Sequence, residues 1–459
     1  MISFIIPTRD RPEQLAITLA HLGNLPVPQL ARAGGAEMLV ADNASRFVPV
    51  VPERLANGVP VSLILMAKND GAAARNAAAR AAKGQWLIML DDDSHPLDSG
   101  FIDVLRDAPD DVAAIGAEIF LLPSERARSV SDGSADQLGG SRLHSPPTQS
   151  RGSLFGSLER TVPAPHHREA GGLPEVFIGC GVAIRRSVFL DADLGSPMPG
   201  VFAGGGYDPA FHYYAEEYDL AARIIRAGLR TIHHRGFRVM HRKVTSGRDM
   251  NTILRRLVRN NAWVEQRYAP EHERRAAIQR VVSRYRAIAE KEHALEGYTL
   301  GLGDLDDTLD HQPRAEMTQH QYDRFTGLAA ARAHLGALLR EARPRRVCII
   351  EPGKNLWVVE RAVVEAGVEL TPNPDDADTL VIGTLSPGPM LDAAERWAGC
   401  GRSVLCGWAP ANQRGDGAPI PRLRESEQFD GVGLTFQLNG PKANGGRPGG
   451  TGERLRHSA

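Results

Sequence analysis

Short apolar runs alternate with helical patterns over the first hundred residues, and this alternation most constrains the fold. The apolar runs are strand-length, and they cover residues 2–6, 38–41, 61–66 and 86–90. An amphipathic helix is predicted around Leu15, Leu19 and Leu22, and an Ala-rich helix over 71–82. Strands that alternate with helices form βαβ units on a mostly parallel sheet. The sequence therefore predicts an α/β fold.

Three consecutive carboxylates, Asp91, Asp92 and Asp93, follow the predicted strand at 86–90. The carboxyl ends of strands are where open α/β sheets bind ligands. Carboxylates this close repel one another, and a hard divalent cation is their usual neutraliser. The triplet therefore indicates a Mg²⁺ or Mn²⁺ site, with a solvated acidic turn as the alternative.

Length and composition exclude several classes of protein. A chain of 459 residues is long enough for about two or three domains. A net charge of −1 provides no overall attraction to nucleic acid or to anionic membranes. The four cysteines contain no CxxC pair, which argues against a zinc site or a disulfide framework and favours a reduced, cytoplasmic compartment.

Membrane segments are not expected either. Residues 1–7 predict a strand and not a signal peptide. No window reaches about 18 uninterrupted apolar residues, so no transmembrane segment is predicted. Peripheral membrane association stays open.

Changes in composition divide the chain into four predicted segments. Residues 1–250 form the first α/β domain, in which 123–174 are rich in Ser, Gly, Pro and Arg and predict a long mobile insertion. Residues 251–343 are helical and charged, and 344–411 predict a small Rossmann-like α/β domain without a GxGxxG turn. Residues 412–459 predict a disordered tail.

A second acidic pair, Glu216 and Glu217, stands at the start of a predicted helix that ends at Gly228. A flexible glycine turn at 204–206 and the aromatic pair at 213–214 precede it. Two short strands are predicted after this helix, at 231–234 and 237–240, and His241 follows the second. Acids at the start of a helix are also favoured by its dipole alone.

Six segments in this order resemble one family: FIIPTRDR, VADNAS, NDGAAARNAAARAAKGQWLIMLDDD, GCGVAIRRSVF, GGGYDPAFHYYAEEYDLAARIIRAG and VMHR. Together they are similar to the inverting family-2 glycosyltransferases of the GT-A fold, over residues 1–245. The resemblance implies a GT-A-type, nucleotide-binding, mixed but mostly parallel sheet. It also implies a nucleoside-diphosphate sugar as donor, Mn²⁺ or Mg²⁺ as cofactor, and transfer with inversion to a carbohydrate-type acceptor.

The resemblance implies roles for individual residues as well. It places the general base at Glu217, where the family has Asp, with Glu216 as the alternative base. It places the metal at Asp93, Asp91 and His241, with Asp93 the stronger ligand. The residues implied for donor binding are Pro7, Thr8, Arg9, Arg11, Asp42, Gly71, Arg75, Asp91 and Asp92. These roles require the aspartate triplet and the glutamate pair, which are far apart in sequence, to meet in one cleft.

Several of these residues also have a purely structural interpretation. Asp42 could be an N-cap or turn acid, Arg75 could lie on a solvated helix face, and His241 could be a structural or surface residue. The sequence leaves two other functions open: a sugar-1-phosphate nucleotidyltransferase, against which the PTRDRP loop argues, and a non-catalytic glycan- or nucleotide-binding protein. Residues 304–309 match the DxDxT signature of haloacid-dehalogenase-type phosphatases, but two nearby glycines favour a turn between helices.

Overall fold

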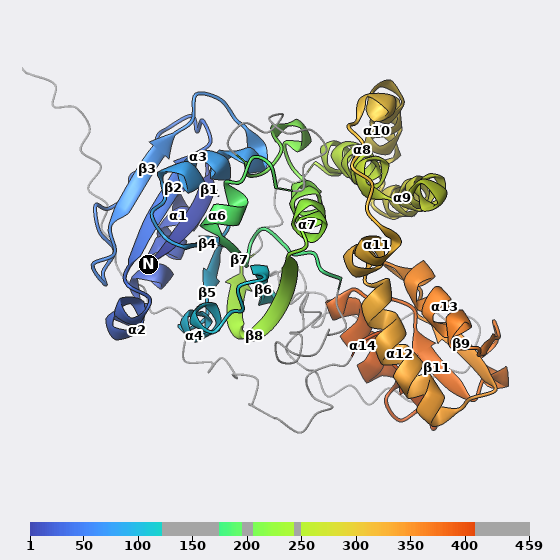
Figure 1. Ribbon diagram of the computed structural model, residues 1–459. Coiled ribbons are helices and arrows are strands. Elements are labelled where there is room, and N and C mark those ends of the chain that lie inside the picture. The colour runs from blue at the N-terminus through green and yellow to red at the C-terminus, as the bar shows by residue number, and fades with distance from the viewer. Residues whose placement is uncertain (122–173, 195–204, 243–248, 409–459) are drawn as a thin grey trace, which may run out of the picture. The chain divides into compact units, whose positions relative to one another are not determined.

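The computed structural model describes residues 1–121, 174–194, 205–242 and 249–408 (Figure 1). Within these residues two sheets are flanked by helices. The predicted mobile insertion (123–174, except its last residue) and the predicted tail (412–459) lie outside the described residues, as does the first residue of the predicted glycine turn.

The main sheet has eight strands in the order β3-β2-β1-β4-β7-β6-β8-β5. Pairings among β3, β2, β1 and β4 are parallel, as is β6 with β8, and the other pairings are antiparallel. This arrangement confirms the predicted mixed, mostly parallel α/β sheet. The strands are β1 (Ile2–Thr8), β2 (Ala36–Asp42), β3 (Val61–Leu65), β4 (Trp86–Met89), β5 (Ser94–Pro96), β6 (Val112–Leu121), β7 (Val182–Arg185) and β8 (Arg230–His241).

Both faces of this sheet are buried, as the continuous apolar runs predict. Successive side chains of a strand point to opposite faces. Accordingly Ile5 belongs to one hydrophobic core and its neighbours Phe4 and Ile6 to another. The helices that accompany the sheet are α1 (Pro12–Gly23), α2 (Val27–Arg32), α3 (Ala74–Ala81), α4 (Phe101–Arg106), α6 (Arg186–Phe189) and α7 (Glu216–Arg226), with 3₁₀ turns η1 (Gly71–Ala73) and η2 (Pro209–Phe211).

Three predicted boundaries differ from the structure. Pro7 lies inside β1 because the pairing with β4 ends at Ile5, so the missing N–H of Pro7 faces no strand on that side. The two predicted strands at 231–234 and 237–240 are one long strand, β8, whose register against β6 shifts midway. The helix predicted from residue 71 begins as the 3₁₀ turn η1.

The region predicted to be helical is helical. It comprises α8 (Met250–Tyr268), α9 (Glu271–Lys291), α10 (Leu295–Thr308), η3 (Leu309–His311), α11 (Gln319–Thr326) and α12 (Leu328–Ala342). The turn predicted at 304–309 is wrong, because Asp304 lies within α10. An aspartate on a helix does not have the strand-tip position that phosphatase chemistry requires.

The second sheet has four parallel strands in the order β10-β9-β11-β12. Its elements are β9 (Arg346–Ile350), α13 (Leu356–Glu365), β10 (Glu369–Leu370), η4 (Pro374–Asp376), β11 (Thr379–Ile382), α14 (Pro387–Trp397) and β12 (Ser403–Leu405). The bounds of the four predicted segments stay predictions.

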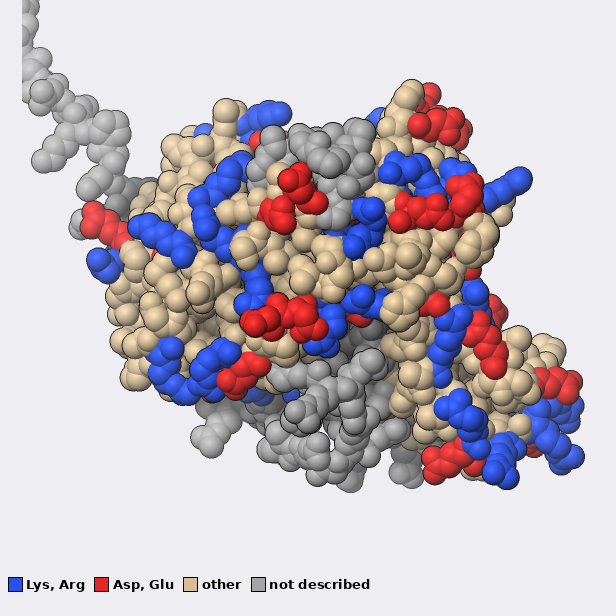
Figure 2. Space-filling view, in the orientation of Figure 1, with Lys and Arg blue, Asp and Glu red and all other residues tan. Residues whose placement is uncertain are grey.

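The described surface has a mixed charge. Acidic and basic side chains are interspersed over the face in Figure 2, in keeping with a net charge of −1. None of the helices in the described ranges combines the length and apolar character needed to cross a bilayer.

Candidate functional site

The three carboxylates after β4 have different surroundings. Asp92 is buried, accepts a hydrogen bond from Thr8 Oγ1 at 2.9 Å and pairs with Arg11 at 2.7 Å. Burial raises the pKa of Asp92 to about 7, against the opposing charge of Arg11. Asp93 is also buried, with Arg11 Nη2 2.6 Å from Oδ2 and His241 Nε2 3.1 Å from Oδ1. Although burial alone would raise it, these two contacts hold the pKa of Asp93 below its usual range.

Asp91 is the member of the triplet that faces open space. Its carboxylate accepts a hydrogen bond from Arg75 Nη2, which also donates to the Leu90 carbonyl at 3.1 Å. Arg75 is only 4% exposed, so it does not lie on a solvated helix face. A buried cation of this kind needs an anionic partner, and Asp91 provides it.

A cavity of about 220 Å³ lies between the aspartate triplet and α7. Asp91 of the triplet, His241 and both glutamates line this cavity, so the predicted convergence of the two acidic groups on one cleft is confirmed. Its lining consists of Arg75, Asp91, Ile119, Ile178, Gly179, Cys180, Tyr213, Tyr214, Glu216, Glu217 and His241.

The loop before α7 has an unusual backbone. His212, Tyr214 and Ala215 all have positive φ, a conformation that costs a non-glycine residue about 1–3 kcal/mol. The side-chain amide of Asn260, on α8, donates to the carbonyls of Phe211, Tyr213 and Tyr214 at 2.8–2.9 Å. The helical region thus holds the strained loop that presents the glutamate pair to the cavity.

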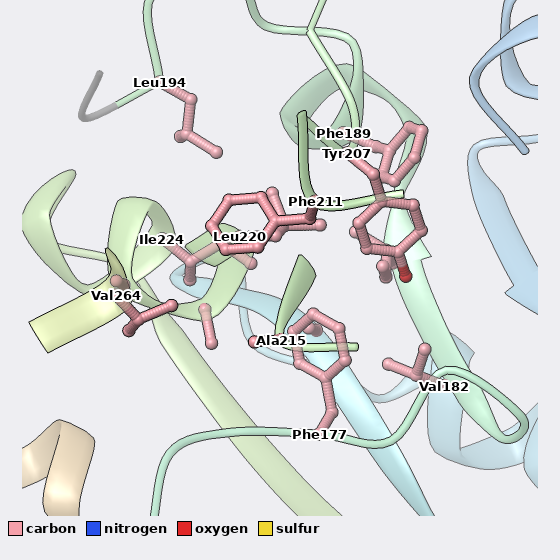
Figure 3. Packing of buried hydrophobic residues seen from close by; sticks show 14 of the residues in the cluster. Phe177, Val182, Phe189, Leu194, Tyr207, Phe211, Ala215, Leu220, Ile224 and Val264 are labelled. Carbon is pink, nitrogen blue, oxygen red and sulfur yellow. The ribbon is translucent and has the colours of Figure 1, made fainter. Parts of the chain in front are cut away.

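Apolar packing also supports the loop before α7. Figure 3 shows Phe211 beside Leu220 and Ile224 of α7, and the rings of Phe189 and Tyr207 meet edge to face at 5.2 Å. The side chain of Asn76 on α3 exchanges two hydrogen bonds with the backbone of Tyr207, at 2.8 and 2.9 Å. These contacts tie the loop to the helix that contains Arg75.

The surroundings of the two glutamates raise their pKa values to different extents. Burial raises the pKa of both, and the charge of Glu217 raises that of Glu216 further. Glu217 Oε1 accepts a hydrogen bond from Gly179 N at 3.1 Å, which favours its ionised form. Glu216 is 5% exposed, and its Oε2 has no hydrogen-bond partner among the described residues. These surroundings favour ionisation of Glu217 before that of Glu216.

The other residues implied for donor binding lie at the carboxyl ends of β1 and β2 or in the turn before α3, and none lines the cavity. Thr8 and Arg11 contact the aspartate triplet, as described above. Arg9 has an exposed side chain near Asp10, and Pro7 is half-buried in β1. Asp42 is buried and accepts a hydrogen bond from Ser45 N at 3.2 Å. Their nucleotide-binding roles stay predictions.

Gly71 has a structural reason for being glycine. Its φ is +62°, and a Cβ added there would lie 2.0 Å from the carbonyl oxygen of His212. The same carbonyl accepts a hydrogen bond from Ala72 N at 2.6 Å. The turn before α3 therefore packs directly against the loop that leads to the glutamate pair.

Gly71→Ala is expected to lower the free energy of unfolding by about 2–4 kcal/mol, because left-handed strain adds to a backbone clash. The matched control is Gly228→Ala, since Gly228 has φ +80° but nothing within 4 Å of an added Cβ. That control should lose only about 1–2 kcal/mol in urea denaturation. Equal losses in the two variants would show that the contact with His212 contributes nothing.

Sequence reasoning missed Cys180. Its sulfur lies 3.6 Å from His241 Nδ1, and ligand atoms of Asp91, Cys180 and His241 all lie within 4.8 Å of one another. Cys180 comes just before β7, and β7 pairs with β4 antiparallel. Only that pairing brings the GCG segment beside the aspartate triplet, and a lone cysteine in the sequence does not indicate it.

Comparison with known proteins identifies the N-terminal part of the chain. Residues 3–121 match the family model "Glycosyl transferase family 2". An uncharacterized glycosyltransferase of Haemophilus influenzae is 33% identical over 94 residues, which are 20% of this chain and 29% of that relative. The match thus spans less than a third of the relative's length. These two findings confirm the resemblance to family-2 glycosyltransferases over residues 3–121.

Several solved glycosyltransferase structures are similar to this chain. GalNAc-T7 with UDP, GalNAc and Mn²⁺ is 16% identical, with 68% of this chain and 58% of that chain covered and a TM-score of 0.42. A mannosyltransferase from Pyrobaculum calidifontis with GDP-Man and Mn²⁺ is 13% identical, with coverages of 72% and 84% and a TM-score of 0.36. S. aureus TarS 1–349 with UDP-GlcNAc is 10% identical, with 86% of this chain and 92% of that chain covered and a TM-score of 0.35.

Proposed function

Because residues 3–121 match glycosyl transferase family 2, we propose that this protein is an inverting glycosyltransferase. It transfers a sugar from a nucleoside-diphosphate donor to an acceptor hydroxyl. The observation that supports this most is that Glu216, Glu217, Asp91 and His241 line one cavity. Inverting transfer needs a base on one side of the sugar and stabilisation of the leaving group on the other.

Glu217 acts as the general base. The acceptor oxygen attacks the anomeric carbon while the bond from that carbon to the diphosphate oxygen breaks, and the acceptor proton passes to Glu217. A base works best with a pKa close to the working pH, and burial raises the pKa of Glu217 in that direction. Glu216 keeps its proton and donates a hydrogen bond to a sugar or acceptor oxygen.

A divalent cation, Mn²⁺ or Mg²⁺, fits the wall that Asp91 and His241 help to form. Asp93 does not line the cavity, but its Oδ1 is buried 3.1 Å from His241 Nε2 and has no hydrogen-bond partner among the described residues. Carboxylate ligands suit Mn²⁺. When bound, the cation would act as a Lewis acid for the leaving diphosphate.

The donor nucleotide extends from this wall over the carboxyl ends of β1 and β2. Arg75, held by Asp91 at the cavity, faces the diphosphate, and the buried Asp42 accepts a hydrogen bond from the base. Pro7, Thr8, Arg9 and Arg11 form the loop around the nucleotide, and Asp92 anchors that loop through Thr8 and Arg11. Gly71 allows the backbone to approach the donor.

A donor screen tests this proposal. Nucleoside-diphosphate sugars are added to the full-length protein with and without Mn²⁺, and a matching donor should raise the melting temperature by mass action. That donor should then be consumed in the presence of a carbohydrate acceptor panel, and EDTA should abolish turnover until Mn²⁺ is restored. Pyrophosphate release from a nucleoside triphosphate and a sugar 1-phosphate would instead indicate a nucleotidyltransferase. Binding without transfer would indicate a non-catalytic protein.

A further inference from the structure

Asp91, Cys180 and His241 form a cluster of three potential metal ligands on the cavity wall. One ligand atom from each lies within 4.8 Å of the other two, and all three residues line the cavity, whereas Asp93 does not. We propose that Asp91, Cys180 and His241 Nδ1 bind the divalent cation directly, and that Asp93 is an outer carboxylate that orients the His241 ring. The inference deepens the proposed function, because it defines the metal centre of that same site.

The fold holds these three side chains together through its backbone. In the β4–β7 pair Met89 lies opposite Val182, so the residues before Val182 run beside those after Met89. Ser94 Oγ accepts a hydrogen bond from Asp91 N at 2.8 Å and donates to the Cys180 carbonyl at 3.0 Å. Ser94 is also paired with His241 across β5 and β8. One buried serine therefore contacts all three segments.

The two nitrogens of His241 have different neighbours. Nδ1 faces Cys180 Sγ at 3.6 Å, and Nε2 faces Asp93 Oδ1 at 3.1 Å. A histidine that binds a metal through one nitrogen usually donates its other N–H to a carboxylate or a carbonyl. The other oxygen of Asp93 is occupied by Arg11 at 2.6 Å. Asp93 thus has the contacts of an orienting carboxylate.

Arg75 does not prevent this arrangement. It donates to Asp91 Oδ1, and a carboxylate has a second oxygen available for a cation. A sulfur ligand changes which cation is preferred, because thiolates favour softer metals such as Zn²⁺ and Co²⁺ over Mg²⁺. The site should therefore prefer Co²⁺, Zn²⁺ or Mn²⁺ to Mg²⁺.

Titration of the full-length protein with Co²⁺, without any donor, tests the ligand set. The parent protein should show a thiolate-to-cobalt charge-transfer band in the near ultraviolet, and Cys180→Ser should lose it. The matched control is Cys400→Ser, since Cys400 is an exposed free cysteine outside the cluster, and it should keep the band. Asp93→Asn should also keep the band while it weakens Co²⁺ binding about 10- to 100-fold.

A Co²⁺ complex without the band, a band that survives Cys180→Ser, or no Co²⁺ binding would overturn the proposal. If Cys180→Ser does not fold, Cd²⁺ protection of Cys180 from alkylation in the parent protein decides the question, since protection is expected and its absence rejects the ligand. Sugar transfer that persists without the band would reject this ligand set and leave the proposed function standing. A charge-transfer band in a protein that transfers no sugar would support this ligand set and reject the proposed function.

Discussion

Glu217→Gln is expected to lower the turnover number for sugar transfer about 10²- to 10⁴-fold, the usual contribution of a general base. Glutamine keeps the size of the side chain and an oxygen that can accept the hydrogen bond from Gly179 N. The amide of glutamine cannot take up the proton of the acceptor hydroxyl. Donor affinity, measured by thermal shift with Mn²⁺, should therefore be almost unchanged while turnover is lost.

Glu216→Gln is the matched control, because the two acids are adjacent and line the same cavity. A glutamine at this position can still donate a hydrogen bond, as the protonated acid does, so turnover should fall much less. If Glu216→Gln is the more damaging change and Glu217→Gln retains the parent rate, the assignment of the base is reversed.

The pH dependence of turnover follows from the same pair. The base must be ionised, and burial raises the pKa of Glu217 above its usual value of 4.5. Turnover should therefore rise with pH, and the midpoint of this rise should lie above pH 4.5. Glu216→Gln should leave that rise in place, whereas the residual rate of Glu217→Gln should no longer follow it.

Asp219→Asn is expected to lower the free energy of unfolding by about 3–5 kcal/mol, as breaking a buried ion pair does. Asp219 has no exposed surface, and its carboxylate accepts hydrogen bonds from Arg223, Arg267 and Tyr268 at 2.7–3.0 Å. These donors belong to α7 and α8. Loss of the negative charge would remove the buried anion that Arg223 and Arg267 share, while Asp208 would still lie 2.8 Å from Arg267.

The control for this change is Asp111→Asn. Asp111 also pairs with an arginine, Arg230, at 2.6 Å, but its side chain is 54% exposed. Exposed pairs contribute about 0–1 kcal/mol, so urea denaturation should show little effect. Similar losses in the two variants would contradict the role assigned to the buried network.

The effect of Asp219→Asn should also depend on pH. Burial alone would raise the pKa of Asp219, but Arg223 and Arg267 hold it below its usual range. A lowered pKa in the folded state stabilises the protein above the unfolded-state pKa of about 4, and this stabilisation is lost as the pH falls through the folded value. The stability difference between parent and variant should therefore shrink below about pH 4.

Local patterns were sufficient for most of the fold. The apolar runs that became β1, β2 and β4 are read directly because both faces of these strands are largely buried, so nearly every residue in them is apolar. The edge strand β3 is only partly buried, but its residues are apolar apart from Ser62. Errors occurred where strand pairing decides the outcome, as with Pro7 inside β1 and the single strand β8.

The candidate site, like the fold, was predictable in part. The residues proposed to carry the chemistry, namely the aspartate triplet, the glutamate pair and His241, can be picked out in the sequence, because carboxylates after a strand or at a helix start are local patterns. The direction in which each of these side chains points cannot be read from the sequence. The triplet is divided by its tertiary contacts, with Asp92 and Asp93 turned toward Arg11 and only Asp91 toward the cavity.

By itself, then, the sequence determined the α/β class, the order of the elements and the similarity of residues 3–121 to family 2 glycosyl transferases, because these depend on periodicity and on local motifs. The tertiary structure alone decided that Asp91, and not Asp92 or Asp93, lines the cavity with Glu217, that Cys180 lies beside His241, and that α8 supports the loop before α7. These contacts join residues far apart in the chain. They depend on strand order and pairing direction, which no local pattern encodes.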